Sequence, residues 1–239
     1  MNDISKLLSQ IDGGIVLDAA TGKGEFISVL KTHLKSYIQI IGVDNAERNV
    51  DYAQKVFPEN DIEIYKMNLE DLQFEVEYFD LVCISNSLHH LEKRDNAVLE
   101  MLRVLKPGGT ILITEMYCDG IQTPAQQTHI KMHHWLSGVD RLLGVYHQET
   151  YKKEELVSFA KTLGLKETNI VDFYTPVDNP IKNCESLVRN CKDTLKKLES
   201  IANSEDLIKE GKEMLVRLSE IGCASASRVL ITGHKPKNK

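Results

Sequence analysis

An acidic residue and a glycine-containing turn near the start of the chain have the types and spacing that hold a nucleotide-like cofactor. The apolar run Ile15–Asp18 ends in a carboxylate, and the turn that follows it contains Ala20, Thr21, Gly22 and Gly24. Glycine permits a tight turn and leaves no Cβ between a ligand and the main chain. We therefore predict a strand–loop–helix unit that binds a cofactor against its backbone.

Polar residues also stand at the ends of three later apolar runs. These residues are Asp44 and Asn45 after a second run, Asn68 (followed by the apolar Leu69) after a third, and Ser85 and Asn86 at the end of a fourth. In an open α/β sheet, ligands bind outside the carboxyl ends of the parallel strands. The pattern therefore places all four groups at the predicted binding edge.

Strand and helix signals alternate along most of the chain. The predicted strands are Ile15–Asp18, Ile38–Asp44, Ile62–Met67, Phe79–Ser85, Thr110–Met116, Thr168–Tyr174 and Arg228–Gly233. The segment Pro107-Gly108-Gly109 is expected to form a turn before the fifth strand. Repeated strand–helix units with nearly continuous apolar strands predict an α/β fold, whose mostly parallel sheet carries helices on both faces.

Composition limits the class of protein and its partners. The chain has 239 residues, 42% of them hydrophobic and 27% charged, which suits a single domain over residues 1–239. A net charge of -6 argues against nucleic acid as the main partner. Residues 1–14 lack a signal-peptide pattern, and no apolar run is long enough to cross a membrane. Five scattered cysteines without CxxC spacing favour a reducing, cytoplasmic location.

The glycine turn and the three groups at the later strand ends, followed by the segment Arg103–Gly109, form a set of motifs. This set resembles the motifs of the Rossmann-like, class I S-adenosylmethionine (SAM) methyltransferases. The resemblance is closest to the group that contains the quinone-biosynthesis enzymes, and it covers roughly residues 15–116. It implies that SAM is the cofactor. It also implies a sheet of seven strands, the last of them antiparallel.

The resemblance also implies a role for each matching position. Asp18 and the backbone from Ala20 to Gly24 should hold the methionine end of SAM. Asp44, with Asn45 beside it, should accept hydrogen bonds from both ribose hydroxyls. Asn68 and Leu69 should meet adenine, and Ser85 and Asn86 should line the strand edge beside the sulfonium.

Two positions depart from the family pattern. Ala20 stands where the family has its first glycine, and Asn68 stands where an aspartate is common. An acid such as Asp44 would also serve the ribose of NAD, so a nicotinamide-dependent oxidoreductase is an alternative. The loop argues against it, because Ile27 occupies the third small position of the GxGxxG/A pattern.

Two segments leave the predicted sheet at its binding edge. The first is the lid segment, residues 117–148, in which Thr123-Pro124 predicts a helix start. The second is the hairpin, residues 177–223, whose heptad-like spacing predicts two antiparallel helices with a break at Asn203-Ser204. We expect both segments to select the acceptor. A homodimer formed through the hairpin stays open as a second role.

The lid segment is rich in histidines, and these are the candidate catalytic residues: His129, His133, His134 and His147. The HxxxH spacing of the first two permits a metal pair, and a third ligand would have to come from His147, Asp140, Glu115 or Cys118. Ile130 stands where a zinc protease needs glutamate, and we predict no metal site. For the pair His89-His90 we favour packing or loop fixing over catalysis.

These observations predict a methyltransferase that moves the SAM methyl group to a small-molecule acceptor by in-line SN2 displacement. No Asn-Pro-Pro-Tyr motif follows the fourth strand, which disfavours amino methylation of DNA bases. Two alternatives remain beside the nicotinamide enzyme. One is a regulatory or partner protein that binds SAM without transfer, and the other is a protein or RNA acceptor.

Overall fold

The computed structural model describes residues 4–237, and the chain divides into two compact units. The first unit contains the described residues up to Glu115, together with Val157–Phe173 and those from Val229 onward. The second unit contains Met116–Leu156 and Tyr174–Arg228. The lid segment and the hairpin both fall within this second unit.

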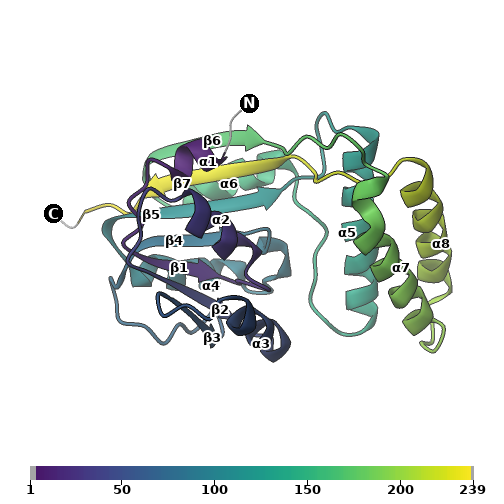
Figure 1. The fold of residues 1–239 in the computed structure, drawn as a ribbon, viewed down its shortest axis with the longest axis horizontal. Coiled ribbons are helices and arrows are strands. Elements are labelled where there is room, and N and C mark those ends of the chain that lie inside the picture. The colour runs from purple at the N-terminus through teal and green to yellow at the C-terminus, as the bar shows by residue number, and fades with distance from the viewer. Residues whose placement is uncertain (1–3, 238–239) are drawn as a thin grey trace. The chain divides into compact units, whose positions relative to one another are not determined.

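A single sheet organises the first unit, and within the described residues its strand order is β3-β2-β1-β4-β5-β7-β6 (Figure 1). The strands are β1 (Ile15–Ala19), β2 (Gln39–Asp44), β3 (Ile62–Lys66), β4 (Phe79–Ser85), β5 (Leu105–Met116), β6 (Lys166–Phe173) and β7 (Arg228–His234). The four pairings from β3 to β5 are parallel. Strand β7 is antiparallel, as its exchange of backbone hydrogen bonds between Lys235 and Gly108–Gly109 illustrates. The predicted α/β sheet is confirmed.

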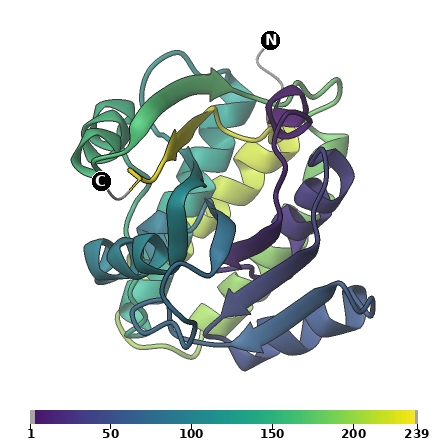
Figure 2. The ribbon, with the colours of Figure 1, turned by 90° about the vertical axis from the view of Figure 1, so that its left-hand side faces the viewer.

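Helices cover both faces of this sheet. The helices are α1 (Ile4–Leu8), α2 (Glu25–His33), α3 (Glu47–Val56), α4 (Arg94–Val104) and α6 (Lys153–Thr162). Figure 2 shows α1 and α2 on one side of the strands and α4 and α6 on the other. Because apolar residues line both faces, each strand of the middle of the sheet is almost wholly buried.

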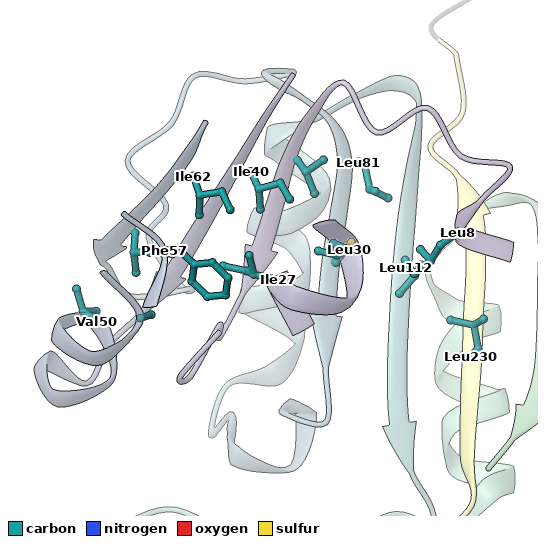
Figure 3. Packing of buried hydrophobic residues seen from close by; sticks show 14 of the residues in the cluster. Leu8, Ile27, Leu30, Ile40, Val50, Phe57, Ile62, Leu81, Leu112 and Leu230 are labelled. Carbon is teal, nitrogen blue, oxygen red and sulfur yellow. The ribbon is translucent and has the colours of Figure 1, made fainter. Parts of the chain in front are cut away.

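The core beneath α2 and α3 joins the helices to the strands. Ile27 and Leu30 of α2 and Phe57 after α3 pack against Ile40 and Ile62 of the sheet (Figure 3). Each of these side chains is buried. Burial of a side chain of this size contributes about 1.5–3 kcal/mol, so this layer anchors the loops at the strand ends.

Two parts of the first unit differ from the sequence prediction. Helix α1 was not predicted, because five residues carry too little periodic signal. Strand β5 begins at Leu105 rather than Thr110. The prediction that a turn at residues 107–109 precedes the strand is therefore wrong, because these residues lie within β5. Partners Phe79–Leu105 and Leu81–Thr110 leave four residues of β5 facing one of β4, so this segment is a bulge inside the strand.

The second unit is built around three long helices. They are α5 (Pro124–Leu142), α7 (Glu185–Leu198) and α8 (Glu205–Glu220). The predicted start of α5 is present as a capping box, in which Thr123 and Gln126 exchange hydrogen bonds. The buried Trp135 of α5 donates its indole N–H to the backbone oxygen of Leu207 at 2.8 Å. Gly211 permits this close packing, since a Cβ there would lie 2.6 Å from the Trp135 ring.

None of the helices among residues 4–237 combines the length and the apolar character that crossing a bilayer requires.

The glycine turn yields a test of local packing. Gly24 has φ +86, and a Cβ there would lie 2.3 Å from the Phe57 ring, whereas Gly22 has φ +56 and nothing within 4 Å of its Cβ position. We expect Gly24→Ala to lower the free energy of unfolding by about 2–4 kcal/mol, from backbone strain and overpacking together. Gly22→Ala is the matched control and should cost only about 1–2 kcal/mol, from strain alone. Urea unfolding without cofactor measures both, and equal losses would contradict the packing role of Phe57.

Candidate cofactor site

Asp18 lies at the carboxyl end of β1, enclosed by its neighbouring strands. Its register partners are Gly42 on β2 and Cys83 on β4, and its side chain is 1% exposed. The Thr21 hydroxyl donates to Asp18 Oδ2 at 2.5 Å. Burial raises the pKa of the Asp18 carboxyl to about 7, and nearby Asp44 adds to the rise, while the Thr21 hydrogen bond opposes it. A proton on Asp18 therefore relieves the cost of a charge in this buried position.

Asp44 ties the glycine loop of β1 to the start of α3. Its Oδ2 accepts the Gly22 N–H at 2.9 Å, and its Oδ1 accepts the Ala46 N–H at 2.9 Å. The Asn49 side-chain amide donates to the same Oδ1 at 3.1 Å. The carboxylate is 7% exposed, so these donors replace much of the water it would hold.

The glycine loop is closed at its base and open at its tip. The Thr21 N–H donates to Val43 O at 2.9 Å, and the Gly24 N–H donates to Thr21 O at 2.8 Å. Gly22 faces space that no protein atom fills within 4 Å of its Cβ position, which leaves its backbone accessible to a ligand. Ala20 adopts φ 54, a left-handed conformation that glycine takes without strain and alanine does not.

The ends of β3 and β4 carry the remaining predicted groups. The Asn68 carbonyl accepts the Glu70 N–H at 3.0 Å, so the side chain shapes its own loop and keeps its amide donors for other partners. Leu69 is buried beside it. Ser85 shares a hydroxyl–hydroxyl hydrogen bond of 3.3 Å with Thr114 on β5.

Asn86 offers an acceptor that no group of the described residues uses. Its backbone has φ 48 and its N–H donates to Thr114 O at 2.8 Å, which fixes the residue at the strand end. Its side-chain Oδ1 is buried, and within residues 4–237 no donor reaches it. A buried carbonyl oxygen without a donor is costly, so this position suits a ligand that brings an N–H group.

The buried pair His89–Glu115 connects the loop after β4 with β5. His89 Nδ1 lies 3.0 Å from Glu115 Oε1, and the Leu88 N–H donates to Glu115 Oε2 at 2.8 Å. Both side chains are 0% exposed, whereas His90 is exposed. These contacts are those of the loop-fixing role favoured from the sequence.

The second unit brings two of the four candidate catalytic histidines together. The rings of His129 and His133 lie edge to face, with centroids 4.7 Å apart. His129 Nδ1 accepts the Ala226 N–H at 3.2 Å, so the ring proton sits on Nε2. Burial lowers the pKa of His129 to about 4, and Arg228 contributes to the fall. His129 is therefore a neutral donor rather than a base near pH 7.

The other two candidates hold separate partners. His134 Nε2 lies 2.8 Å from the Thr150 hydroxyl, and its Nδ1 lies 3.6 Å from Glu149. His147 is buried, and its Nδ1 donates to Asp140 Oδ2 at 2.6 Å. A carboxylate only accepts, so this contact places the His147 proton on Nδ1 and a lone pair on Nε2.

Sequence reasoning missed three residues of this region: Asn49, Thr114 and Glu115 in its pairing with His89. Asn49 carried a usable signal, since it follows Asp44 by five residues and sits in the first turn of the next helix. The other two carried none, because their partners lie 26 or more residues away in the sequence.

Comparison with known proteins decides which cofactor this geometry serves. Residues 17–113 match the family model described as a methyltransferase domain. Residues 17–113 are thus a methyltransferase domain, and the chain resembles the class I SAM-dependent methyltransferases. SAM is accordingly the cofactor, and the nicotinamide alternative falls away.

Curated relatives of the chain include two kinds of enzyme. The O-methyltransferase rstn1 of Aspergillus nomiae is 25% identical over 68% of this chain and 75% of its own length. The ubiquinone/menaquinone biosynthesis C-methyltransferase UbiE of Vibrio vulnificus is 31% identical over 43% of this chain and 41% of its own. The match thus spans less than half of the quinone enzyme. The solved YcgJ protein of Bacillus subtilis shares the fold, with a TM-score of 0.60 at 18% identity over 98% of this chain and 97% of that one.

The residues of the first unit fit SAM group by group. The buried Asn86 oxygen and the open Gly22 backbone suit the ammonium and carboxylate of the methionine end. Asp44 suits a ribose diol, because only a carboxylate gives acceptor positions on two oxygens there. Bound SAM supplies a methyl group on a positively charged sulfur, and the protein's own groups only need to hold it.

Asp18 predicts a pH dependence of stability. Its pKa is about 7 in the folded protein against 3.8 in the unfolded chain. Between these values the folded state holds a proton that the unfolded state releases, so stability falls as pH rises from about 4 to 7. The slope is about 1 kcal/mol per pH unit within that window. Urea unfolding from pH 4.5 to 7.5 measures it, and Asp18→Asn should remove this component.

The difference between the variant and the wild type removes the contributions of the other titrating groups to the pH dependence of stability. His129 is one of them, and its lowered pKa acts with the opposite sign, raising stability as pH rises from about 4 to 6.5. Parallel pH profiles for wild type and Asp18→Asn would contradict a raised Asp18 pKa.

Asp44→Ala tests the ribose assignment. We expect at least a hundredfold loss of affinity for SAM and S-adenosylhomocysteine, since two charge-assisted hydrogen bonds disappear. Calorimetric titration measures the affinity, and circular dichroism confirms that the fold persists. Asp51→Ala is the control, because Asp51 is an exposed carboxylate on the following helix α3. Unchanged affinity in Asp44→Ala would refute the assignment.

Proposed function

We propose that this protein transfers the methyl group of SAM to a small-molecule acceptor by in-line SN2 displacement. The observation that carries the proposal is the Asp44 carboxylate, bonded to the Gly22 N–H of the neighbouring loop within the methyltransferase domain. The relatives named as O- and C-methyltransferases support a small acceptor. The net charge of -6 also favours a small molecule over RNA.

Alignment supplies most of the expected acceleration. When the protein holds both the cofactor and the acceptor, the reaction between them is effectively unimolecular. Well-oriented intramolecular reactions reach effective molarities on the order of 10⁵ M or more. The chain inserts the second unit directly after β5, whose carboxyl end belongs to the cofactor edge of the sheet. We therefore assign acceptor binding to residues of the lid segment and the hairpin.

His147 is the histidine best suited to take a proton from an oxygen or nitrogen acceptor. Asp140 fixes its ring at 2.6 Å and directs the lone pair to Nε2, which is the arrangement of an oriented general base. The other candidates fit less well. His129 has a lowered pKa, His134 bonds a hydroxyl, and His133 stacks edge-on with His129. We assign the base role to His147 and the positioning role to Asp140.

Cytoplasmic location and a homodimer through the hairpin stay predictions. The five cysteines are all free in the described structure, which supports a reducing compartment.

The first experiment is calorimetric titration with SAM, S-adenosylhomocysteine and NADH. Binding of the two adenosyl ligands without NADH supports the proposal. A screen of small acceptors with methyl-labelled SAM then tests transfer. A protein that binds SAM and methylates nothing would favour the regulatory alternative, whereas label found only in protein or RNA would refute the small-molecule acceptor.

His147→Asn tests the base on an acceptor that the screen finds. We expect kcat to fall about 10²-fold or more with an unchanged Kd for SAM, because the proton acceptor is lost while the cofactor site is intact. Asp140→Asn should lower kcat less and shift the pH profile, since it acts through the orientation of His147. His134→Asn is the control and should keep kcat within about twofold. An unchanged kcat in His147→Asn would contradict the assignment.

A further inference from the structure

The Asp44 carboxylate is nearly saturated before any ribose reaches it. A carboxylate offers about four acceptor positions, two on each oxygen. Three of them are filled, by the Gly22 N–H, the Ala46 N–H and the Asn49 side-chain amide. One position remains. A ribose with two adjacent hydroxyls needs two, so one of the protein donors has to leave when the cofactor binds.

The three donors are not equally free to leave. Gly22 and Ala46 donate through the backbone, and both bonds are 2.9 Å long. The Gly22 loop is held at its base by hydrogen bonds of Thr21, and Ala46 is the N-cap residue of α3. Moving either of these donors would move the main chain.

Asn49 differs from both of them. It donates through a rotatable side chain, its bond is the longest of the three at 3.1 Å, and the residue is only half-buried. A side-chain rotation would release Asp44 Oδ1 and return the amide to water. Rotation about the side-chain bonds of a partly exposed residue needs no change in the backbone.

We propose that Asn49 is a displaceable latch on Asp44, which occupies one ribose position in the free protein and swings away when SAM binds. The proposal rests on the SAM assignment and is independent of the acceptor. The latch makes Asn49 a determinant of affinity for SAM and S-adenosylhomocysteine alike, because both ligands carry the same ribose. Each binding event breaks the Asn49–Asp44 hydrogen bond, and each release of product reforms it.

This exchange predicts that removing the amide strengthens cofactor binding. Without Asn49 the ribose gains the same hydrogen bonds and breaks none of the protein's own. For this partly exposed bond we use the typical net contribution of a hydrogen bond, roughly 1 kcal/mol, which corresponds to a gain in affinity of about three- to tenfold. A ligand with one ribose hydroxyl fits the remaining position, and its affinity should not depend on Asn49.

Calorimetric titration of Asn49→Ala and Asn49→Leu tests the latch with two probes, S-adenosylhomocysteine and its 2′-deoxyribose analogue. We expect both variants to bind S-adenosylhomocysteine about three- to tenfold more tightly than the wild type and the analogue equally well. Asn96→Ala and Asn96→Leu are matched controls, because Asn96 is an exposed asparagine in the first turn of α4. They should leave both affinities unchanged. Thermal unfolding confirms that each variant is folded.

A second experiment follows the side-chain amide of Asn49 by NMR. Its side-chain NH₂ resonances are assigned by their loss in Asn49→Ala, and saturation with S-adenosylhomocysteine should move them toward the values of a solvated asparagine. Unmoved resonances would refute displacement.

The other outcomes separate the latch from its rivals. Weaker binding of S-adenosylhomocysteine by both variants would overturn the latch and show that Asn49 contacts the cofactor directly. Tighter binding of both probes would overturn it in favour of a general apolar effect. If the wild type and all variants failed to bind S-adenosylhomocysteine, the SAM assignment itself would fall and the latch with it.

Discussion

A single carboxylate connects the parts that make the cofactor site. Asp44 ends β2, yet its hydrogen bonds reach the loop after β1 and the first turn of α3. Thr21 holds the base of the glycine loop, but Gly22 and Gly24 have no side chains to pack, so the hydrogen bond from Gly22 to Asp44 holds the tip of the loop. The position of the backbone that faces the ligand therefore depends on an acid in another strand.

The same region contains two carboxyl groups that cannot both be charged at low cost. Asp18 is enclosed by the sheet and its pKa is raised, partly by Asp44. Three N–H donors surround Asp44, whereas within residues 4–237 the Asp18 carboxyl accepts a hydrogen bond from the Thr21 hydroxyl alone. A cofactor that carries positive charge on both sulfur and ammonium reduces this conflict. The positive charge of the ligand thus offsets the electrostatic repulsion between the two carboxyl groups.

The sequence predicted most of the sheet and the cofactor residues, because those signals are local. Apolar runs mark buried strands, and the polar groups of the site follow them directly, as Asp18 and Asp44 do. The prediction failed where pairing over distance decides the outcome. Nothing local marks the segment 106–109 as a bulge in β5, since β4 determines its register. The histidines show the same limit: spacing grouped His129 with His133, and only the folded chain reveals the bond between His147 and Asp140.

The second unit is discontinuous in sequence, and that fact bears on how such a protein can change. Its two segments, Met116–Leu156 and Tyr174–Arg228, are separated by the stretch that forms β6 and much of α6. A gene exchange that replaced only one segment would separate Trp135 from Leu207 and Gly211, and so expose an apolar helix face. Recombination between relatives would therefore have to replace both segments at once to keep this helix packing intact. Successive point substitutions within the unit face no such requirement, so under the proposed assignment of acceptor binding to these segments they are the easier evolutionary route to a new acceptor.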